Sequence, residues 1–319
     1  MTDVSIRTML LELVDANGAS HIRELHIEIL RHKPDTPEHT IRARLSEAVS
    51  EGLLDRLGDG FYDVYAENES MTSVVSYPNR MSLWGSSSYR GNCDGRLIKD
   101  LICRYHARKV ADPMEGSGTS RDVVEGLNKY KRAGISFWGG DLHSGFDLTR
   151  QNLPDRFDFV WIHPPYWNII AYRSGPSDLS NCERYEQFRE MLMLCLQRCY
   201  EALETGGRLA VLIGDVRRSG RYTPIVRDVL NFPHGEIRSV IIKVQHNCTS
   251  DRKCYGRMED VPIRHEYCVV FKKRKPGPNL PVAVKDMKAL RPFHCWGDEY
   301  GSNTCRRIQL HCFDISTPI

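Results

Sequence analysis

The residues with the clearest chemical meaning follow an apolar run near the middle of the chain. The run at 158–162 ends in His163-Pro164-Pro165-Tyr166, and Trp167 comes next. Two successive prolines stiffen the backbone and leave carbonyl oxygens that have no N–H group beside them. A rigid carbonyl, a polar side chain and aromatic rings are the groups needed to grip a planar amino group and stack on its ring. An exposed polyproline turn is the alternative interpretation.

A loop earlier in the chain has the composition of a cofactor site. Its residues are Asp112-Pro113-Met114-Glu115-Gly116-Ser117-Gly118-Thr119. Two glycines spaced by one residue let the backbone approach a ligand, and the helix predicted to follow offers unpaired N–H groups at its N-terminus. We expect a nucleotide-type cofactor here, although a tight turn without a ligand would use the same residues. The Gly-Lys-Ser/Thr of a Walker loop is missing.

An acidic residue follows at a suggestive distance. Asp141 comes directly after the run ISFWGG at 135–140 and lies 23 positions after Gly118. An acid at the tip of the next strand, about 20 residues after a glycine loop, commonly holds ribose hydroxyls. We favour that function for Asp141 over the alternative, a side chain that caps its own turn.

The elements that must position these loops alternate between helix and apolar strand from residue 94 to about 272, which predicts a wound α/β sheet. The predicted strands are 109–112, 135–138, 157–162, 208–213, 237–244 and 265–271. The clearest predicted helices are 95–105, 120–131, 183–203 and 224–230. In this arrangement both loops and Asp141 follow strands, where the ligand crevice of such sheets opens.

The first 65 residues have a different pattern, with three amphipathic helices and a hairpin that turns at Gly58-Asp59-Gly60. This order resembles a winged-helix domain, in which the third helix enters the major groove of DNA. Arg42 and Arg44 lie on that helix and are candidate DNA contacts. A small helical domain used for protein contacts is the alternative.

The two loops together resemble those of the amino-group DNA methyltransferases, which methylate adenine N6 or cytosine N4 with S-adenosylmethionine. The resemblance extends over roughly residues 77–273. It implies a Rossmann-like methyltransferase fold with a mainly parallel seven-stranded sheet whose last strand is antiparallel. The implied domains are a winged-helix-like DNA-binding domain at 1–68, a linker and cofactor loop at 69–93, the methyltransferase domain at 94–274 and a tail at 275–319.

The resemblance also implies residue functions. The cofactor would be held by Asn92, Asp112, Glu115, Gly116, Gly118, Thr119 and Asp141. Among these, Asn92 is also a candidate helix N-cap, as is Asp94. Catalysis would be carried by His163, Pro164, Pro165 and Tyr166, with Tyr166 stacked on a base that has left the duplex and Trp167 forming a wall of its pocket. The Pro164 carbonyl and the side chain of residue 163 would accept hydrogen bonds from the target amine, and no covalent intermediate is required.

One position departs from the family, which usually has Asp, Asn or Ser where this chain has His163. A neutral imidazole accepts one hydrogen bond and a protonated one accepts none. We therefore expect activity to fall below about pH 6. Adenine N6 is the preferred target and cytosine N4 the alternative.

The long polar loop between the last two strands contains Arg252, Lys253 and Arg257, which are candidates for contacts with DNA phosphates or with the orphaned base. A solvated surface loop is the alternative. Two other functions stay open at this point: an RNA methyltransferase, and a DNA-binding regulator with a degenerate transferase domain.

Composition limits the remaining choices. The chain has 319 residues, a formal net charge of +3, 41% hydrophobic residues and 11 cysteines. No apolar run is long enough for a membrane span and no signal peptide is apparent, so we expect a cytoplasmic, nucleoid-associated protein of a prokaryote or phage, for example from a restriction-modification system, with reduced thiols and no membrane partner. Cysteine and histidine spacings match no usual zinc module, so no metal is expected. A homodimer is one of several oligomeric states left open.

Overall fold

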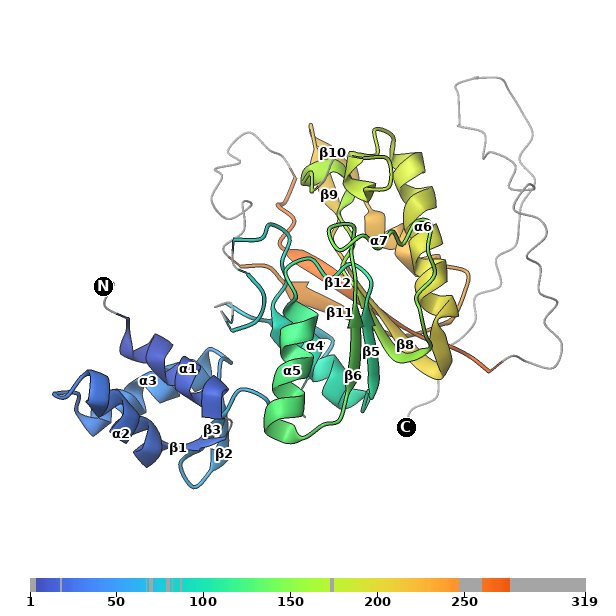
Figure 1. Cartoon of the computed structure of the whole chain (residues 1–319). Helices are drawn as coiled ribbons and strands as arrows, with labels where there is room; N and C mark the ends of the chain where they lie inside the picture. The colour runs from blue at the N-terminus through green and yellow to red at the C-terminus, as the bar shows by residue number, and fades with distance from the viewer. Residues whose placement is uncertain are drawn as a thin grey trace, which may run out of the picture. The chain divides into compact units, whose positions relative to one another are not determined.

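A mixed seven-stranded sheet is the centre of the computed structural model (Figure 1). Its strands are β4 (Val74–Ser76), β5 (Lys109–Asp112), β6 (Ser136–Gly139), β7 (Phe157–Ile162), β8 (Leu203–Ile213), β11 (Glu236–Val244) and β12 (His265–Lys272), in the order β4-β11-β12-β8-β7-β5-β6. β12 runs antiparallel to both neighbours, and the other four pairings that join the sheet are parallel. The expected mainly parallel seven-stranded sheet with an antiparallel last strand is therefore confirmed.

The structure describes residues 4–17, 19–66, 68, 71–78, 81, 83–86, 88–172, 175–246 and 260–275. The chain divides into two compact units, Met1–Lys275 and Pro276–Ile319, and the second lies outside the described residues. The tail expected at 275–319 is thus described only at its first residue. Within the described ranges, no helix combines the length and the apolar character needed to cross a bilayer.

The sheet is buried on both faces, and its central strands contain uninterrupted apolar runs such as residues 159–162 of β7. In β7, Phe159 and Trp161 pack into one hydrophobic core, while Val160 and Ile162 pack into the other. Successive side chains of a strand point to opposite faces, so a strand covered on both sides needs a continuous apolar run. This is why β7 was predictable from the sequence with its observed bounds.

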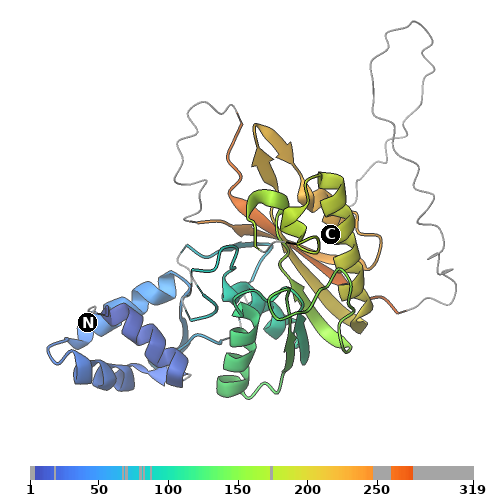
Figure 2. The same ribbon diagram turned by 45° about the horizontal axis from the view of Figure 1, so that its top comes forward.

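Helices cover both faces. The first core includes the apolar side chains of α4 (Gly95–Arg104) and α5 (Thr119–Lys131), and the second includes those of α6 (Tyr185–Glu201) and α7 (Ile225–Leu230). Figures 1 and 2 accordingly show α6 across the sheet from α4 and α5. The remaining short elements are the hairpin β9 (Val216–Arg218) and β10 (Arg221–Thr223) and the 3-10 turns η1 (Trp167–Ile169) and η2 (Leu179–Asn181).

Strand β4 lies within the segment that was predicted from the sequence to be a linker and cofactor loop. β4 falls within 69–93 and pairs with β11 through Val74, Val75 and Ser76. Two adjacent valines are too short a run to show a period, so the sequence carried no signal for this strand. β8 also begins earlier than expected, at Leu203, because its first half contains Gly206 and Gly207 and few apolar residues.

The N-terminal part contains α1 (Ile6–Asn17), β1 (Ser20–His21), α2 (Ile22–His32), α3 (Glu38–Ser50), β2 (Asp55–Gly58) and β3 (Phe61–Asp63). The strands form a small antiparallel sheet in the order β1-β3-β2. Val14, Ile29, Ile41 and Leu45 are completely buried between the helices. The three helices and the hairpin are therefore present as expected, while a winged-helix assignment and its DNA-binding function stay predictions.

Candidate active site

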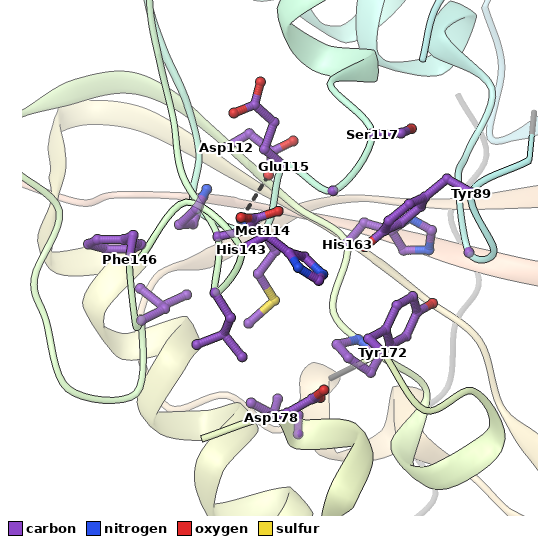
Figure 3. A pocket seen from close by; sticks show the side chains of 18 of the residues that line it. Tyr89, Asp112, Met114, Glu115, Ser117, His143, Phe146, His163, Tyr172 and Asp178 are labelled. Carbon is purple, nitrogen blue, oxygen red and sulfur yellow. Dashed lines mark hydrogen bonds between the residues drawn. The ribbon is translucent and has the colours of Figure 1, made fainter. Parts of the chain in front are cut away.

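A cavity opens at the carboxyl ends of β5, β6 and β7 (Figure 3). Of the residues singled out in the sequence, its lining includes Asn92, Asp112, Glu115, Gly116, Thr119, Asp141, His163 and Pro165. Four other predicted site residues are adjacent in the sequence to lining residues or lie within the same segment, but are not part of the lining: Gly118, Pro164, Tyr166 and Trp167. Ligands of open α/β sheets bind in a crevice at this end of the strands. The structure thus brings the predicted cofactor loop and the His163 segment to one hollow.

Asp112 braces the loop after β5. Its Oδ1 accepts a hydrogen bond from the Met114 N–H at 3.0 Å, and its Oδ2 accepts one from Ser120 Oγ at 2.5 Å. Burial raises the pKa of this carboxyl to about 7, against the lowering effect of these two hydrogen bonds. The Asp112 carbonyl also accepts from Gly140 N at 3.0 Å, which ties the tips of β5 and β6 together.

Glu115 is paired within the protein. Arg121 Nε lies 2.6 Å from Glu115 Oε1, and Arg121 Nη2 lies 2.8 Å from Oε2. The carboxylate occupies the space above Gly139, where a Cβ would come within 2.1 Å of Oε2. The charge of Glu115 is therefore compensated by Arg121 before any ligand binds, which sequence reasoning did not anticipate.

The two loop glycines have left-handed backbone conformations. Gly116 has a φ of +57° and Gly118, the N-cap of α5, has a φ of +84°. A Cβ on Gly116 would lie 3.0 Å from Cε1 of Tyr89, which itself lines the cavity. Because glycine adopts a positive φ without steric cost, the loop can make this turn, and Gly116 itself lines the cavity.

Asn92 joins a preceding loop to the start of α5. Its Oδ1 accepts a hydrogen bond from Thr119 Oγ1, and its Nδ2 donates to the Ser86 carbonyl at 2.8 Å. The N-cap of α4 is Asp94, which accepts from Arg96 N at 3.0 Å. The alternative interpretation of Asn92 as a helix cap is therefore wrong, and its side chain lines the cavity instead.

Asp141 caps its own turn and also lines the cavity. Its Oδ1 accepts a hydrogen bond from Ser144 N at 2.8 Å, so it does cap the turn after β6. Its side chain also lines the cavity, and within the described ranges its Oδ2 has no hydrogen-bond partner. Capping one oxygen leaves the other available to a ligand hydroxyl.

The His163 segment is connected to two residues that sequence reasoning missed. His163 Nε2 lies 2.9 Å from the Tyr166 hydroxyl, which donates to Glu266 Oε1 at 2.6 Å. Lys243 Nζ donates to Glu266 Oε2 at 2.7 Å. The available signal was a glutamate and a lysine next to the apolar runs of β12 and β11, since charged groups are rarely buried without a partner.

The environment of His163 changes the pH expectation. Burial lowers the pKa of His163 to about 4, and the Lys243 charge acts in the same direction while Glu266 opposes it. Burial alone would raise the pKa of Glu266, but Lys243, His163 and two hydrogen bonds lower it to about 2. The expected loss of activity below about pH 6 is therefore corrected, because this imidazole stays neutral until near pH 4.

Tyr166 and Trp167 contact other parts of the chain that are not in the cavity lining. A Cβ on Gly214 would lie 2.6 Å from Cε2 of Tyr166, so the ring packs closely against that glycine. Trp167 Nε1 donates to the Cys182 carbonyl at 2.8 Å. Two of the aromatic rings that do line the cavity are Tyr89 and Tyr172, whose centroids are 6.0 Å apart with an interplanar angle of 29°. Neither tyrosine had been predicted as a site residue.

The candidate DNA contacts divide into two groups. On α3, both candidate arginines are exposed. Arg42 is paired with Glu38 at 2.5 Å and Arg44 with Glu47 at 2.6 Å, so their charges are compensated within the helix. Arg252, Lys253 and Arg257 lie outside the described residues. In the described part of the chain, no cluster of three or more His, Cys, Asp or Glu side chains has a geometry suited to a metal ion.

Comparison with known proteins adds one family match. Residues 157–304 match the sequence profile of a protein family described as DNA methylase. The match begins with β7 and includes the His163 segment and the Lys243–Glu266 pair. It confirms the resemblance to DNA methyltransferases over that part of the chain. No curated protein matches this chain with significant similarity.

The chain is also similar, at low sequence identity, to several solved structures. TrmN from Thermus thermophilus is 17% identical, with 58% of this chain and 50% of that chain covered and a TM-score of 0.33. A putative DNA modification methylase from Thermus thermophilus, complexed with S-adenosyl-L-methionine, is 20% identical over 55% of this chain and 59% of its own, with a TM-score of 0.30. The N-methyltransferase NodS from Bradyrhizobium japonicum, in complex with S-adenosyl-L-homocysteine, is 10% identical over 56% and 87%, with a TM-score of 0.32. This chain spans about half the length of the two Thermus proteins.

Proposed function

We propose that this protein transfers a methyl group from S-adenosylmethionine to the exocyclic amine of a DNA base. The proposal starts from the match of residues 157–304 to the DNA methylase family. The observation that supports this most directly is the single cavity shared by the glycine loop after β5 and by His163 and Pro165 after β7. A methyl donor and an acceptor amine must meet in one site, and the two loops contribute the groups suited to each.

The residues around the loop fit such a cofactor. Ser117 Oγ is buried in the cavity wall and has no hydrogen-bond partner in the described part of the chain, which marks a place for a polar ligand atom. Asp112, Asp141 and Gly116 line the cavity, and the positive φ of Gly116 and Gly118 lets the loop turn beside it. We propose that Asn92, Asp112, Glu115, Gly116, Gly118 and Thr119 form the methionine end of the cofactor site and that Asp141 Oδ2 accepts from its ribose.

Catalysis would consist mainly of positioning. When bound, S-adenosylmethionine supplies a methyl group on a sulfonium sulfur, which the target nitrogen takes up with release of one proton. The lone pair of an exocyclic amine is delocalised into its ring and reacts poorly. Hydrogen bonds from the amine to the Pro164 carbonyl and to neutral His163 would favour a pyramidal nitrogen, while Pro165 keeps the segment rigid.

Adenine N6 is the proposed target, and cytosine N4 is the alternative. The base would leave the duplex at a cost of a few kcal/mol and enter the hollow beside His163. Tyr166 is half-buried and its hydroxyl edge is held by His163 and Glu266, so its remaining exposed ring surface would contact the base. Trp167 would form the adjoining wall. The N-terminal domain and the loop with Arg252, Lys253 and Arg257 are the proposed DNA-binding parts.

The decisive experiment uses the full chain with labelled S-adenosylmethionine and three acceptors: duplex DNA, single-stranded DNA and RNA. Label in duplex DNA that nucleoside analysis finds as N6-methyladenine supports the proposal, and N4-methylcytosine selects the alternative base. His163→Ala should abolish transfer, whereas His32→Ala, at an exposed site on α2, should not. Label found only in RNA would replace the proposal with an RNA methyltransferase, and DNA binding without cofactor binding would indicate a regulator.

A further inference from the structure

A continuous series of hydrogen bonds leads from a buried ion pair to the candidate active site. Lys243 Nζ contacts Glu266 Oε2 at 2.7 Å, Glu266 Oε1 accepts from the Tyr166 hydroxyl at 2.6 Å, and that hydroxyl lies 2.9 Å from His163 Nε2. Glu266 has 7% of its surface exposed, and the Lys243 side chain has 12%. The series ends at His163, which lines the cavity.

The direction of every hydrogen bond in this series follows from the donor inventory. An ammonium group only donates, and an ionised carboxylate only accepts. A carboxylate buried beside an ammonium is ionised, since the opposite charge stabilises its anion. The single proton of the Tyr166 hydroxyl must therefore point at Glu266 Oε1. The hydroxyl oxygen can then interact with His163 Nε2 only by accepting a hydrogen bond from an Nε2–H group.

A neutral imidazole carries one N–H group. If Nε2 bears that hydrogen, Nδ1 has a lone pair, and in the described part of the chain Nδ1 has no hydrogen-bond partner. We propose that Glu266 and Lys243 are positioning residues that hold His163, through Tyr166, in the Nε2–H tautomer and so present Nδ1 as the acceptor for the N–H of the target amine. The second half of this inference, the contact with the amine, rests on the proposed function.

A histidine needs such positioning because a neutral imidazole has two tautomers. An Asp or Asn side chain at this position would offer an acceptor oxygen without further help. A histidine offers an acceptor or a donor at a given nitrogen according to its tautomer, so the wrong tautomer would point an N–H at another N–H. A fixed charge pair behind Tyr166 removes that ambiguity.

Glu266→Gln tests the direction of the series. Lys243 can only donate, so the carboxamide oxygen of the variant must face Lys243 and its NH2 must face Tyr166. The Tyr166 hydroxyl then accepts from the amide and donates to His163 Nε2, and the imidazole converts to the Nδ1–H tautomer. In Glu266→Gln combined with Lys243→Met, nothing fixes the amide orientation, so the Nε2–H tautomer should reappear beside the Nδ1–H tautomer.

The tautomer is measured on full-length protein labelled with 15N-histidine by long-range 1H–15N correlation, with His163→Asn used to assign the resonance among 12 histidines. Tyr166→Phe should leave a mixture of tautomers. The matched control is Tyr65→Phe, because the Tyr65 hydroxyl also accepts one hydrogen bond, from Trp84 Nε1, and donates one to a carboxylate, Asp15, and is not part of the cavity lining. This control should leave the His163 signal unchanged.

We expect Glu266→Gln to reverse the tautomer and to lower kcat about 100-fold, in the range of one lost hydrogen bond to the reacting group, with the KM for the cofactor unchanged. An Nδ1–H tautomer in the unsubstituted protein, or the same tautomer in all variants, would overturn the proposal. The NMR result does not depend on methyl transfer. A reversal seen in a protein that methylates no nucleic acid would support the hydrogen-bond assignment and count against the proposed function alone.

Discussion

Lys243 and Glu266 are directly opposed residues of the antiparallel strands β11 and β12, and their side chains meet at 2.7 Å behind the candidate active site. The pair joins the last two strands of the sheet to the His163 segment, which follows β7. The central strand β8 lies between β12 and β7, so Glu266 reaches Tyr166 past the end of that strand, where Gly214 leaves room for the ring.

Removing one partner of this pair should destabilise the protein more than removing both. Glu266→Leu leaves the Lys243 ammonium buried without a counter-charge, and we expect a loss of about 3 kcal/mol in the free energy of unfolding. Combining Glu266→Leu with Lys243→Met removes both charges and should recover most of that loss. Urea denaturation followed by circular dichroism measures both values. Equal losses in the single and the double variant would show that the ion pair does not determine stability here.

The pH dependence of methyl transfer should follow the lowered pKa of His163. The imidazole is neutral above about pH 4, so its acceptor is present at neutral pH and is lost as the pH falls through that value. Glu266, with a pKa lowered to about 2, stays ionised over this range. We expect kcat, measured where circular dichroism shows an intact fold, to stay level from pH 8 to about pH 5 before it falls.

His163→Asn provides the control for this profile. An amide oxygen accepts a hydrogen bond at any of these pH values, so the variant should retain activity and lose the fall near pH 4. A midpoint near pH 6.5 in the unsubstituted protein would show that His163 is solvated during turnover and that its burial has no influence on the reaction.

Most of the sheet could be predicted because its central strands are buried on both faces and contain apolar runs, such as residues 159–162 of β7. β4 could not, because Val74 and Val75 alone show no period. The loops around Asp112 and His163 were predictable as site residues because each directly follows a predicted strand. The pairing of Lys243 with Glu266 depends on the register between β11 and β12, which no local pattern contains. The same holds for the meeting of Tyr89 with Tyr172, which brings together two loops 83 residues apart.

Asp112 should tolerate an amide better than a methyl group. Its carboxyl accepts from Met114 N and from Ser120 Oγ, and burial raises its pKa to about 7. In Asp112→Asn the oxygen can still accept from Met114 N, and the Ser120 hydroxyl can turn to accept from the new NH2. We expect Asp112→Ala to raise the Kd for S-adenosylmethionine about tenfold, equivalent to one lost hydrogen bond, with little change for Asp112→Asn. Isothermal titration calorimetry measures both, and equal Kd values for the two variants would contradict the bracing function.

The proposed binding of DNA by the N-terminal domain should depend on the ion pairs of α3. Arg42 and Arg44 are held by Glu38 and Glu47, so neutralising the two glutamates releases two cations. We expect Glu38→Gln/Glu47→Gln to bind duplex DNA more tightly, and Arg42→Ala/Arg44→Ala to reduce the slope of log K against log salt by about 2. Fluorescence anisotropy over a salt series measures this. An unchanged slope in the arginine variant would place the DNA-binding surface elsewhere.

Gly116→Ala should weaken cofactor binding through the cavity itself, and the chain offers a matched control for backbone strain. Gly116 and Gly134 both have a positive φ, +57° and +64°, so alanine is strained by about 1 kcal/mol at either position. A Cβ on Gly116 would lie 3.0 Å from the Tyr89 ring, whereas one on Gly134 would have nothing within 4 Å. Both variants should therefore lose similar stability, and only Gly116→Ala should raise the Kd for S-adenosylmethionine, by about tenfold. A similar rise in Gly134→Ala would mean that strain, and not the loss of space beside Tyr89, controls cofactor affinity.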